Sequence, residues 1–159
     1  MPSIELVTIA NRPDLTSVVA DWIWTEWDQK YGHPLSHTES AIALSTSLLG
    51  PPQTFILLVD GAPVGTSSFV VADLDERPDL TPWLASVFVV PQARRKGHAI
   101  PLIQAVESAA RAASIPTLWL HTEHAARIYA KAGWQPVEIV ERKGKLPVTL
   151  MRRDIAPGM

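Results

Sequence analysis

The sequence predicts a mixed α/β fold, with a central, mostly antiparallel mixed sheet of about seven strands and about four helices. Strand-like segments, either alternating in polarity or apolar throughout, recur along the chain between turn residues. Helix-like segments separate some of them, so the expected order is β-α-α-β-β-β-α-β-α-β-β. Because no repeat, low-complexity tract or polar linker interrupts the sequence, residues 1–159 are expected to form a single domain.

Two helices are expected after the first strand. Residues 3–10 alternate apolar and polar side chains, and Asn11 then precedes Arg-Pro-Asp as the predicted N-cap of a helix that runs to about Lys30. A second helix should follow Ser36 or His37. It is expected to continue to the Gly-Pro-Pro run at residues 50–52, because glycine permits a left-handed cap and proline cannot continue a helix.

Two hairpins are expected, each around a turn that contains glycine. Residues 54–59 and 63–71 flank Asp60-Gly61, a dipeptide typical of two-residue hairpin turns. Residues 137–142 and 145–153 flank Lys-Gly at 143–144 and form the last hairpin.

The middle of the chain reads as a strand, a long helix and a second strand. Residues 83–90 are nearly all apolar, which is typical of a strand covered on both faces and predicts a central position in the sheet. Alanine-rich residues 97–114 form the helix, in whose first turn Pro101 is tolerated. Residues 117–122 form a strand parallel to the first, and a short helix over 123–132 ends at Gly133.

Composition limits the class of partner. The chain carries 14 Lys and Arg against 16 Asp and Glu, for a net charge of -2, so no nucleic-acid partner is expected and any anion site must be local. The absence of cysteine excludes thiolate metal sites and cysteine nucleophiles, and no metal is expected. No signal-like or membrane-length apolar run is present, so we expect a cytoplasmic protein without a membrane partner.

A basic glycine loop, Arg-Arg-Lys-Gly-His-Ala at residues 94–99, lies between the central strand and the long helix. The first turn of a helix presents unpaired N–H groups and the positive end of the helix dipole, which together bind phosphate. Gly97 lets a phosphate approach the main chain, and the small Ala99 keeps the chain close. A solvated turn is the alternative for a basic triplet, but the position before a helix favours a phosphate site. The spacing fits neither a Walker loop nor a three-glycine Rossmann loop.

The pattern Arg94-x-x-Gly97-x-Ala99 resembles the Q/R-x-x-G-x-G/A signature of the GNAT acetyltransferase superfamily. The preceding strand and the segment from Tyr129 to Gly133-Trp134, similar to the family's Y-x-x-x-G-F/W, agree with it, as does the element order. The resemblance covers nearly the whole chain, although residues 11–54 match only in pattern. It implies the GNAT fold, with acetyl-CoA as co-substrate and direct acetyl transfer to a primary amine.

The resemblance also implies which residues meet acetyl-CoA. In this family the strand before the loop is bulged and splays from its parallel neighbour, so its main chain pairs with the pantetheine arm; an ordinary buried strand is the alternative. The loop's N–H groups from Arg95 to Ile100 would hold the pyrophosphate, with Arg94 and Arg95 as supporting charges. Thr122 lies near a segment where many members have a cofactor-binding asparagine. The implied cofactor-binding residues are Val87, Phe88, Val89, Arg94, Arg95, Lys96, Gly97, His98, Ala99, Ile100 and Thr122.

Two side chains are candidates for acid and base catalysis. Tyr129 matches the family's general acid, because a phenol with a pKa near ~10 can protonate or hydrogen-bond a thiolate whose thiol has a pKa around ~8.5; packing beside Trp134 is the alternative. His121 aligns with a position where some members carry a catalytic glutamate, and an imidazole titrating near pH ~6.5 suits a general base. A water chain is the alternative for that role. At Trp83 the chain departs from members that place a carboxylate near the start of this strand.

The acceptor is expected to be a small-molecule or peptide amine, bound by the first helices and the last hairpin as the resemblance implies. Trp22, Trp24, Trp27, Tyr31 and His33 lie there, although their helical spacing also fits core packing. The acidic loop over residues 73–79 either attracts a cationic amine or is solvated. The protein would act as a monomer or homodimer. A non-catalytic acyl-CoA-binding regulatory module of the same fold is the alternative function.

Overall fold

The computed structural model describes residues 2–157 and contains a seven-stranded sheet in the order β1-β2-β3-β4-β5-β7-β6. The strands are β1 (Ile4–Thr8), β2 (Gln53–Val59), β3 (Ala62–Val70), β4 (Trp83–Val89), β5 (Thr117–Thr122), β6 (Gln135–Arg142) and β7 (Lys145–Asp154). The α-helices are α1 (Thr16–Ile23), α2 (Leu35–Ala43), α3 (Ala99–Ala112) and α4 (Ala126–Lys131). Neighbouring strands are antiparallel except β4 and β5, which are parallel. The predicted mixed, mostly antiparallel sheet is confirmed.

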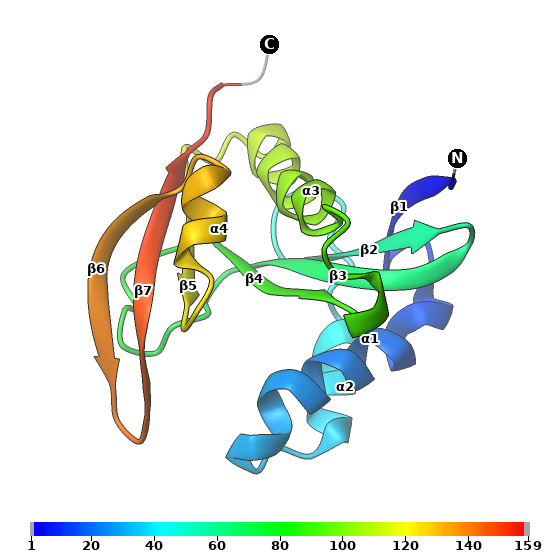
Figure 1. The fold of residues 1–159 in the computed structure, drawn as a ribbon, viewed down its shortest axis with the longest axis horizontal. Coiled ribbons are helices and arrows are strands. Elements are labelled where there is room, and N and C mark those ends of the chain that lie inside the picture. Colours follow the sequence, from blue (N-terminus) through cyan, green and yellow to red (C-terminus); the bar gives the residue numbers. More distant parts are fainter. Residues whose placement is uncertain (1, 158–159) are drawn as a thin grey trace.

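Helices cover both faces of the sheet, with α3 on one side of β2, β3 and β4 and with α1 and α2 on the other (Figure 1). Side chains alternate between the faces of a strand, and β2 shows the consequence. Phe55 joins a buried cluster with Ile103 of α3, whereas the next residue, Ile56, joins a separate cluster with Val19 of α1. Two cores therefore hold β2 from opposite sides.

The first hairpin follows the prediction closely. β2 and β3 are joined by Asp60 at φ 51° and Gly61 at φ 81°, and two left-handed residues in a two-residue loop match the twist of the flanking strands. β6 and β7 form the predicted second hairpin, with Gly144 at φ 72° in its turn.

The first helical segment is less regular than predicted. A 3-10 turn (Pro13–Leu15) precedes α1, and a π-helical turn (Trp24–Asp28) and a second 3-10 turn (Gln29–Tyr31) follow it. The prediction of Asn11 as N-cap is wrong, since Arg12 holds that position without a side-chain hydrogen bond. Asn11 instead donates its N–H to the carbonyl and hydroxyl of Thr8, which makes it part of the turn that ends β1.

The second helix is shorter than predicted. α2 begins at Leu35, directly after Pro34, and ends at Ala43 rather than near residue 50. The reason is tertiary: the Thr54 hydroxyl donates to Ser45 Oγ at 2.7 Å and draws the chain after α2 toward the sheet. No helix within residues 2–157 has the length and apolar character needed to cross a membrane.

Candidate active site

β4 and β5 begin side by side and then separate. The single register pair Trp83–Trp119 joins them. Beyond it lies a cavity of about 370 Å³, the central cleft, lined by Ser86 and Val87 of β4 and by His121 and Thr122 of β5. Within the described residues, the second half of β4 therefore does not pair with β5, and this part of β4 lines the cleft instead.

A bulge redirects β4 at this point. The β3–β4 register shifts between Thr66, which pairs with Phe88, and Ser68, which pairs with Ala85. Ser86 adopts φ 56°, an uncommon conformation for a residue other than glycine. Such a bulge bends the strand and re-aims its groups, and it agrees with the bulged strand that the resemblance implied.

The basic loop joins β4 to the N-terminus of α3. Arg95 at φ 65° and Gly97 at φ 78° are left-handed, and His98 after them is right-handed; a left-handed residue next to a right-handed one turns successive N–H groups toward a concave anion site. A Cβ on Gly97 would meet nothing within 4 Å, so the surface above it is open. The Ile100 N–H donates to the Gly97 carbonyl at 3.3 Å, so a phosphate would compete with that bond. Lys96 is exposed beside these groups.

Arg94 has a bonding role that the sequence did not indicate. Its Nε donates to the Val89 carbonyl at 2.7 Å, and its guanidinium carbon lies 5.5 Å from the centre of the Phe88 ring. These contacts fasten the loop to the end of β4. Within the described residues the loop lies outside the lining of the central cleft, and Val87 is the one implied pantetheine-binding residue in that lining.

Tyr129 lies on α4 and lines the central cleft. Its ring contacts Trp134 edge-on, with centroids 6.3 Å apart, so Tyr129 both packs against Trp134 and lines the cleft. Burial raises the pKa of the Tyr129 phenol to about 12. Thr122 Oγ1 accepts a hydrogen bond from the Ala125 N–H at 3.0 Å and thereby fixes the start of α4.

A polar network on α3 and β7 holds Trp134 in place. The indole Nε1 donates to Glu107 Oε2 at 3.0 Å, and Arg153 Nε lies 3.4 Å from the same oxygen. Arg153 also donates to the Ala132 carbonyl at 2.9 Å. The tryptophan beside Tyr129 is therefore fixed by hydrogen bonds as well as by packing.

His121 and Asp73 form a pair in the lining of the central cleft. His121 Nε2 lies 2.9 Å from Asp73 Oδ2, and the two side chains are 20% and 31% exposed. Burial raises the pKa of the Asp73 carboxyl, and the neighbouring imidazole acts in the opposite direction. The residues of the acidic loop therefore lie in two environments. Asp73 lines the cleft, whereas Asp79 pairs with Arg77 at 3.0 Å on the surface.

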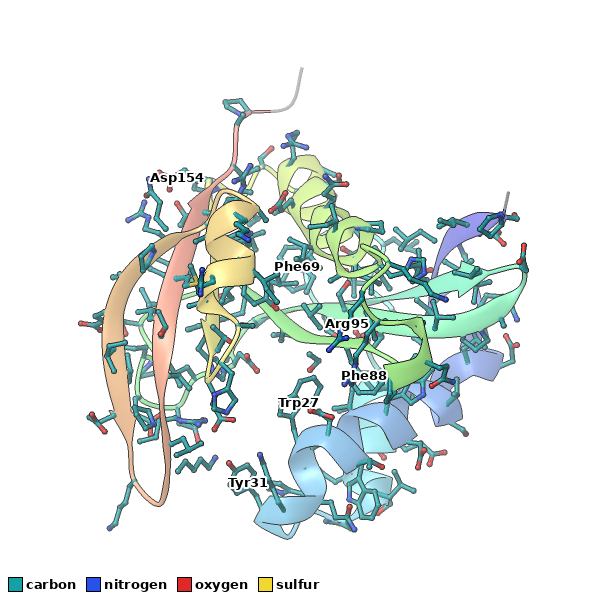
Figure 2. All side chains as sticks on the ribbon, viewed as in Figure 1. Trp27, Tyr31, Phe69, Phe88, Arg95 and Asp154 are labelled. Atoms are coloured by element: carbon teal, nitrogen blue, oxygen red, sulfur yellow. The ribbon has the colours of Figure 1, made fainter. Side chains whose placement is uncertain are left out.

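The aromatic residues of the first helical segment also lie in two environments, the central cleft and the core. The Trp27 ring lies 6.4 Å from that of Phe88, and in Figure 2 it lies between Phe88 and Tyr31. Trp27, Tyr31 and His33 line the central cleft, whereas Trp22 packs against the buried cluster of α1. Trp24 Nε1 donates to the His33 carbonyl at 2.7 Å.

Sequence reasoning missed several cleft residues. Lys145 Nζ lies 4.2 Å from the centre of the Tyr31 ring, and Arg142 pairs with Glu123 at 2.8 Å. Asp28 also lines the cleft. Of these unpredicted cleft residues, only Ser86 stands out in the sequence, because it is a single polar residue within an apolar strand. Among the described residues, no three His, Asp or Glu side chains gather as a metal-ligand set.

Comparison with known proteins places these features in a family. The model of the acetyltransferase (GNAT) family matches residues 17–134. An acetyltransferase of this family from Streptococcus pneumoniae superimposes with a TM-score of 0.71 at 16% identity, over 97% of this chain and 100% of that one. An aminoglycoside 6'-N-acetyltransferase complexed with coenzyme A has a TM-score of 0.75 at 14% identity, over 99% of each chain.

A Salmonella typhimurium protein with its cofactor acetyl-CoA has a TM-score of 0.69 at 16% identity, over 98% of this chain and 94% of that one. At these identities the solved structures establish the fold alone. Comparison with curated protein sequences found no significant match.

Proposed function

Because this chain belongs to the GNAT acetyltransferase family, we propose that it is an N-acetyltransferase that moves an acetyl group from acetyl-CoA directly to a primary amine. The observation that carries the proposal is the separation of β4 from β5 beyond the Trp83–Trp119 pair, beside Tyr129. An extended pantetheine arm can add to such a free strand edge by main-chain hydrogen bonding. The coenzyme A bound to a protein of the same fold supports this choice of donor.

The residues implied for acetyl-CoA fit an extended thioester that carries a pyrophosphate. Main-chain groups of Val87, Phe88 and Val89 would pair with the arm. The N–H groups that follow Arg94 would bind the pyrophosphate at the start of α3, a helix of 14 residues whose dipole favours an anion. Since the space that a Cβ on Gly97 would occupy is open, a phosphate can approach the main chain at this residue.

In the proposed reaction the neutral amine attacks the thioester carbonyl, so a C–N bond forms and the C–S bond breaks. His121 takes the proton that the amine loses: when Nε2 donates to Asp73, whose main-chain carbonyl lies 3.2 Å away and whose Oδ2 lies 2.9 Å away, Nδ1 is left as the acceptor. An N–H group near Val89 polarises the carbonyl. Tyr129 donates a hydrogen bond or its proton to the departing thiolate. The burial that raises the pKa of Tyr129 would also raise the pKa of a coenzyme A thiol beside it. The difference between the two pKa values would then be smaller than if only the phenol were shifted.

Tyr129→Phe tests this function. The variant keeps the ring that packs on Trp134 and removes the donor, so we expect kcat to fall about 10²-fold or more while the Kd for acetyl-CoA stays the same. Tyr31→Phe, at the chain's other tyrosine, is the matched comparison and should retain the chemical step. Equal turnover in wild type and Tyr129→Phe would remove Tyr129 from the mechanism.

Calorimetry separates the cofactor class from the chemistry. Acetyl-CoA and desulfo-CoA should bind much more tightly than ATP, because the pantetheine arm contributes contacts that ATP lacks. Equal affinity for ATP would instead indicate a generic phosphate site. Tight acetyl-CoA binding with no transfer to a broad amine panel would indicate a non-catalytic acyl-CoA-binding module.

A further inference from the structure

A second cavity, the side chamber, adjoins the central cleft on the side of α2. It has a volume of about 330 Å³ and lies against α2, β2, β3 and the segment that leads from β3 to β4. Four buried hydroxyl side chains, each at most 5% exposed, line it: Thr38, Ser45, Thr54 and Ser68. All four hydroxyls have hydrogen-bond partners among the described residues, and their oxygens keep lone pairs on the wall of the cavity.

The two cavities meet at a shared boundary. Ile23, Asp28, Asp73, Ala85 and Ser86 line both. Ala85 and Ser86 belong to the bulged part of β4, where the side chains are small. A molecule that presents one end to Tyr129 and His121 therefore has the side chamber as its neighbouring space.

The hydrogen-bonding capacity of the side chamber suits a donor. Thr38 Oγ1 donates to Asp28 Oδ2 at 2.6 Å, so the threonine hydroxyl keeps only lone pairs to offer. Thr54 Oγ1 donates to Ser45 Oγ at 2.7 Å and lies 3.0 Å from Ser68 Oγ. A carboxylate has about four lone-pair sites, so Asp28 can accept further bonds beyond the one from Thr38.

The charge of the side chamber favours a cation. Its described lining contains Asp28, Asp73 and one histidine, His37, but no lysine or arginine. The positive groups of the central cleft are engaged elsewhere, Arg142 with Glu123 and Lys145 on the Tyr31 ring. An ammonium group, which donates three hydrogen bonds and accepts none, matches both the charge and the lone pairs.

We propose that the side chamber binds the second ammonium group of a linear diamine whose first amine is acetylated in the central cleft. Asp28, held by Thr38, is the main anionic contact, and the buried hydroxyls complete the site. The proposal rests on the proposed N-acetyltransferase function for its reactive end only. Binding of the remote ammonium does not require turnover, and it can be measured separately.

The test compares putrescine with butylamine, which has the same number of carbons and lacks the second amine. Calorimetry on the protein with desulfo-CoA should give putrescine about tenfold or higher affinity over butylamine, equivalent to about 1.4 kcal/mol. Asp28→Asn keeps an acceptor for the Thr38 hydroxyl but removes the charge, and it should reduce this ratio toward one. Asp21→Asn, an identical change at an exposed position of α1, is the matched control and should leave the ratio unaltered.

A second variant keeps the test decisive if Asp28→Asn does not fold. Ala41 is an exposed residue that lines the side chamber, and Ala41→Phe should fill the chamber and also reduce the ratio. Equal binding of the two amines by wild type, or an unchanged ratio in both Asp28→Asn and Ala41→Phe, would overturn the proposal. If putrescine binds selectively but neither amine is acetylated, the diamine site stands and the proposed transfer reaction fails.

Discussion

The ionisation of Tyr129 is a direct test of how the central cleft is built. Burial raises its pKa from 10.0 to about 12. Each pKa unit corresponds to about 1.4 kcal/mol, so the packing around α4 disfavours the phenolate by about 2.7 kcal/mol. The unfolded chain loses this proton near pH 10, whereas the folded chain keeps it. The group's contribution to stability is therefore complete below about pH 10 and is lost as the pH rises to about 12.

The measurement is a spectroscopic titration of Tyr31→Phe, in which Tyr129 is the one tyrosine left of two. At pH 11 about one tenth of the phenol should be ionised, whereas an unshifted group would be about nine tenths ionised. Circular dichroism at the same pH confirms that the fold is retained, and the double variant with Tyr129→Phe supplies the baseline. A titration midpoint near pH 10 in the folded protein would refute the reasoning. It would mean that water reaches the hydroxyl and that the cleft does not desolvate it.

Two further predictions concern β4 and the acidic loop. In Gly65→Ala the new Cβ would lie 2.8 Å from the Phe88 carbonyl and 2.9 Å from Leu102 Cδ1, so we expect a loss of about 1–3 kcal/mol in the free energy of unfolding. Thermal denaturation measures it, and an unchanged midpoint would show that β4 moves without cost. In Asp73→Asn the charge that burial disfavours is absent, so the variant should be more stable than wild type at neutral pH, and the difference should vanish below about pH 3.8. Denaturant unfolding at both pH values is the assay, and lower stability of the variant at pH 7 would show that the pairing with His121 outweighs burial.

Local sequence patterns predicted the elements whose geometry is set locally. Asp60-Gly61 forms its turn because both residues tolerate left-handed conformations, and the long helix begins two residues after Gly97. The basic loop was visible for the same reason, since a basic glycine segment before a helix carries its own geometry. The helix end at Ala43 was missed because Ser45 is held by Thr54, a contact that no local pattern encodes.

The candidate site was predictable only in part. Tyr129 and His121 were found through their position relative to a motif, but the partner of His121 lies 48 residues away, in a loop of several acidic residues. Nothing in that loop distinguishes Asp73 from its neighbours before the strands are placed. Likewise, an apolar run such as residues 83–90 fits a paired strand and a splayed strand equally well, because the difference lies in main-chain hydrogen bonds.

The π-helical turn at Trp24–Asp28 bears on how this protein can change over evolution. There the Gln29 N–H bonds to the Trp24 carbonyl, which places one extra residue in a single turn. Each residue of an α-helix turns the chain by about 100°, so deleting one residue here would restore α-helical bonding and rotate the segment that leads to α2. Asp28 and Tyr31 would then leave the cleft, while β4, the basic loop and α3 would be untouched. Under the proposed function, deletion of a single codon at this turn is thus a short mutational route that changes the acceptor side of the cleft and leaves the acetyl-CoA side unaltered.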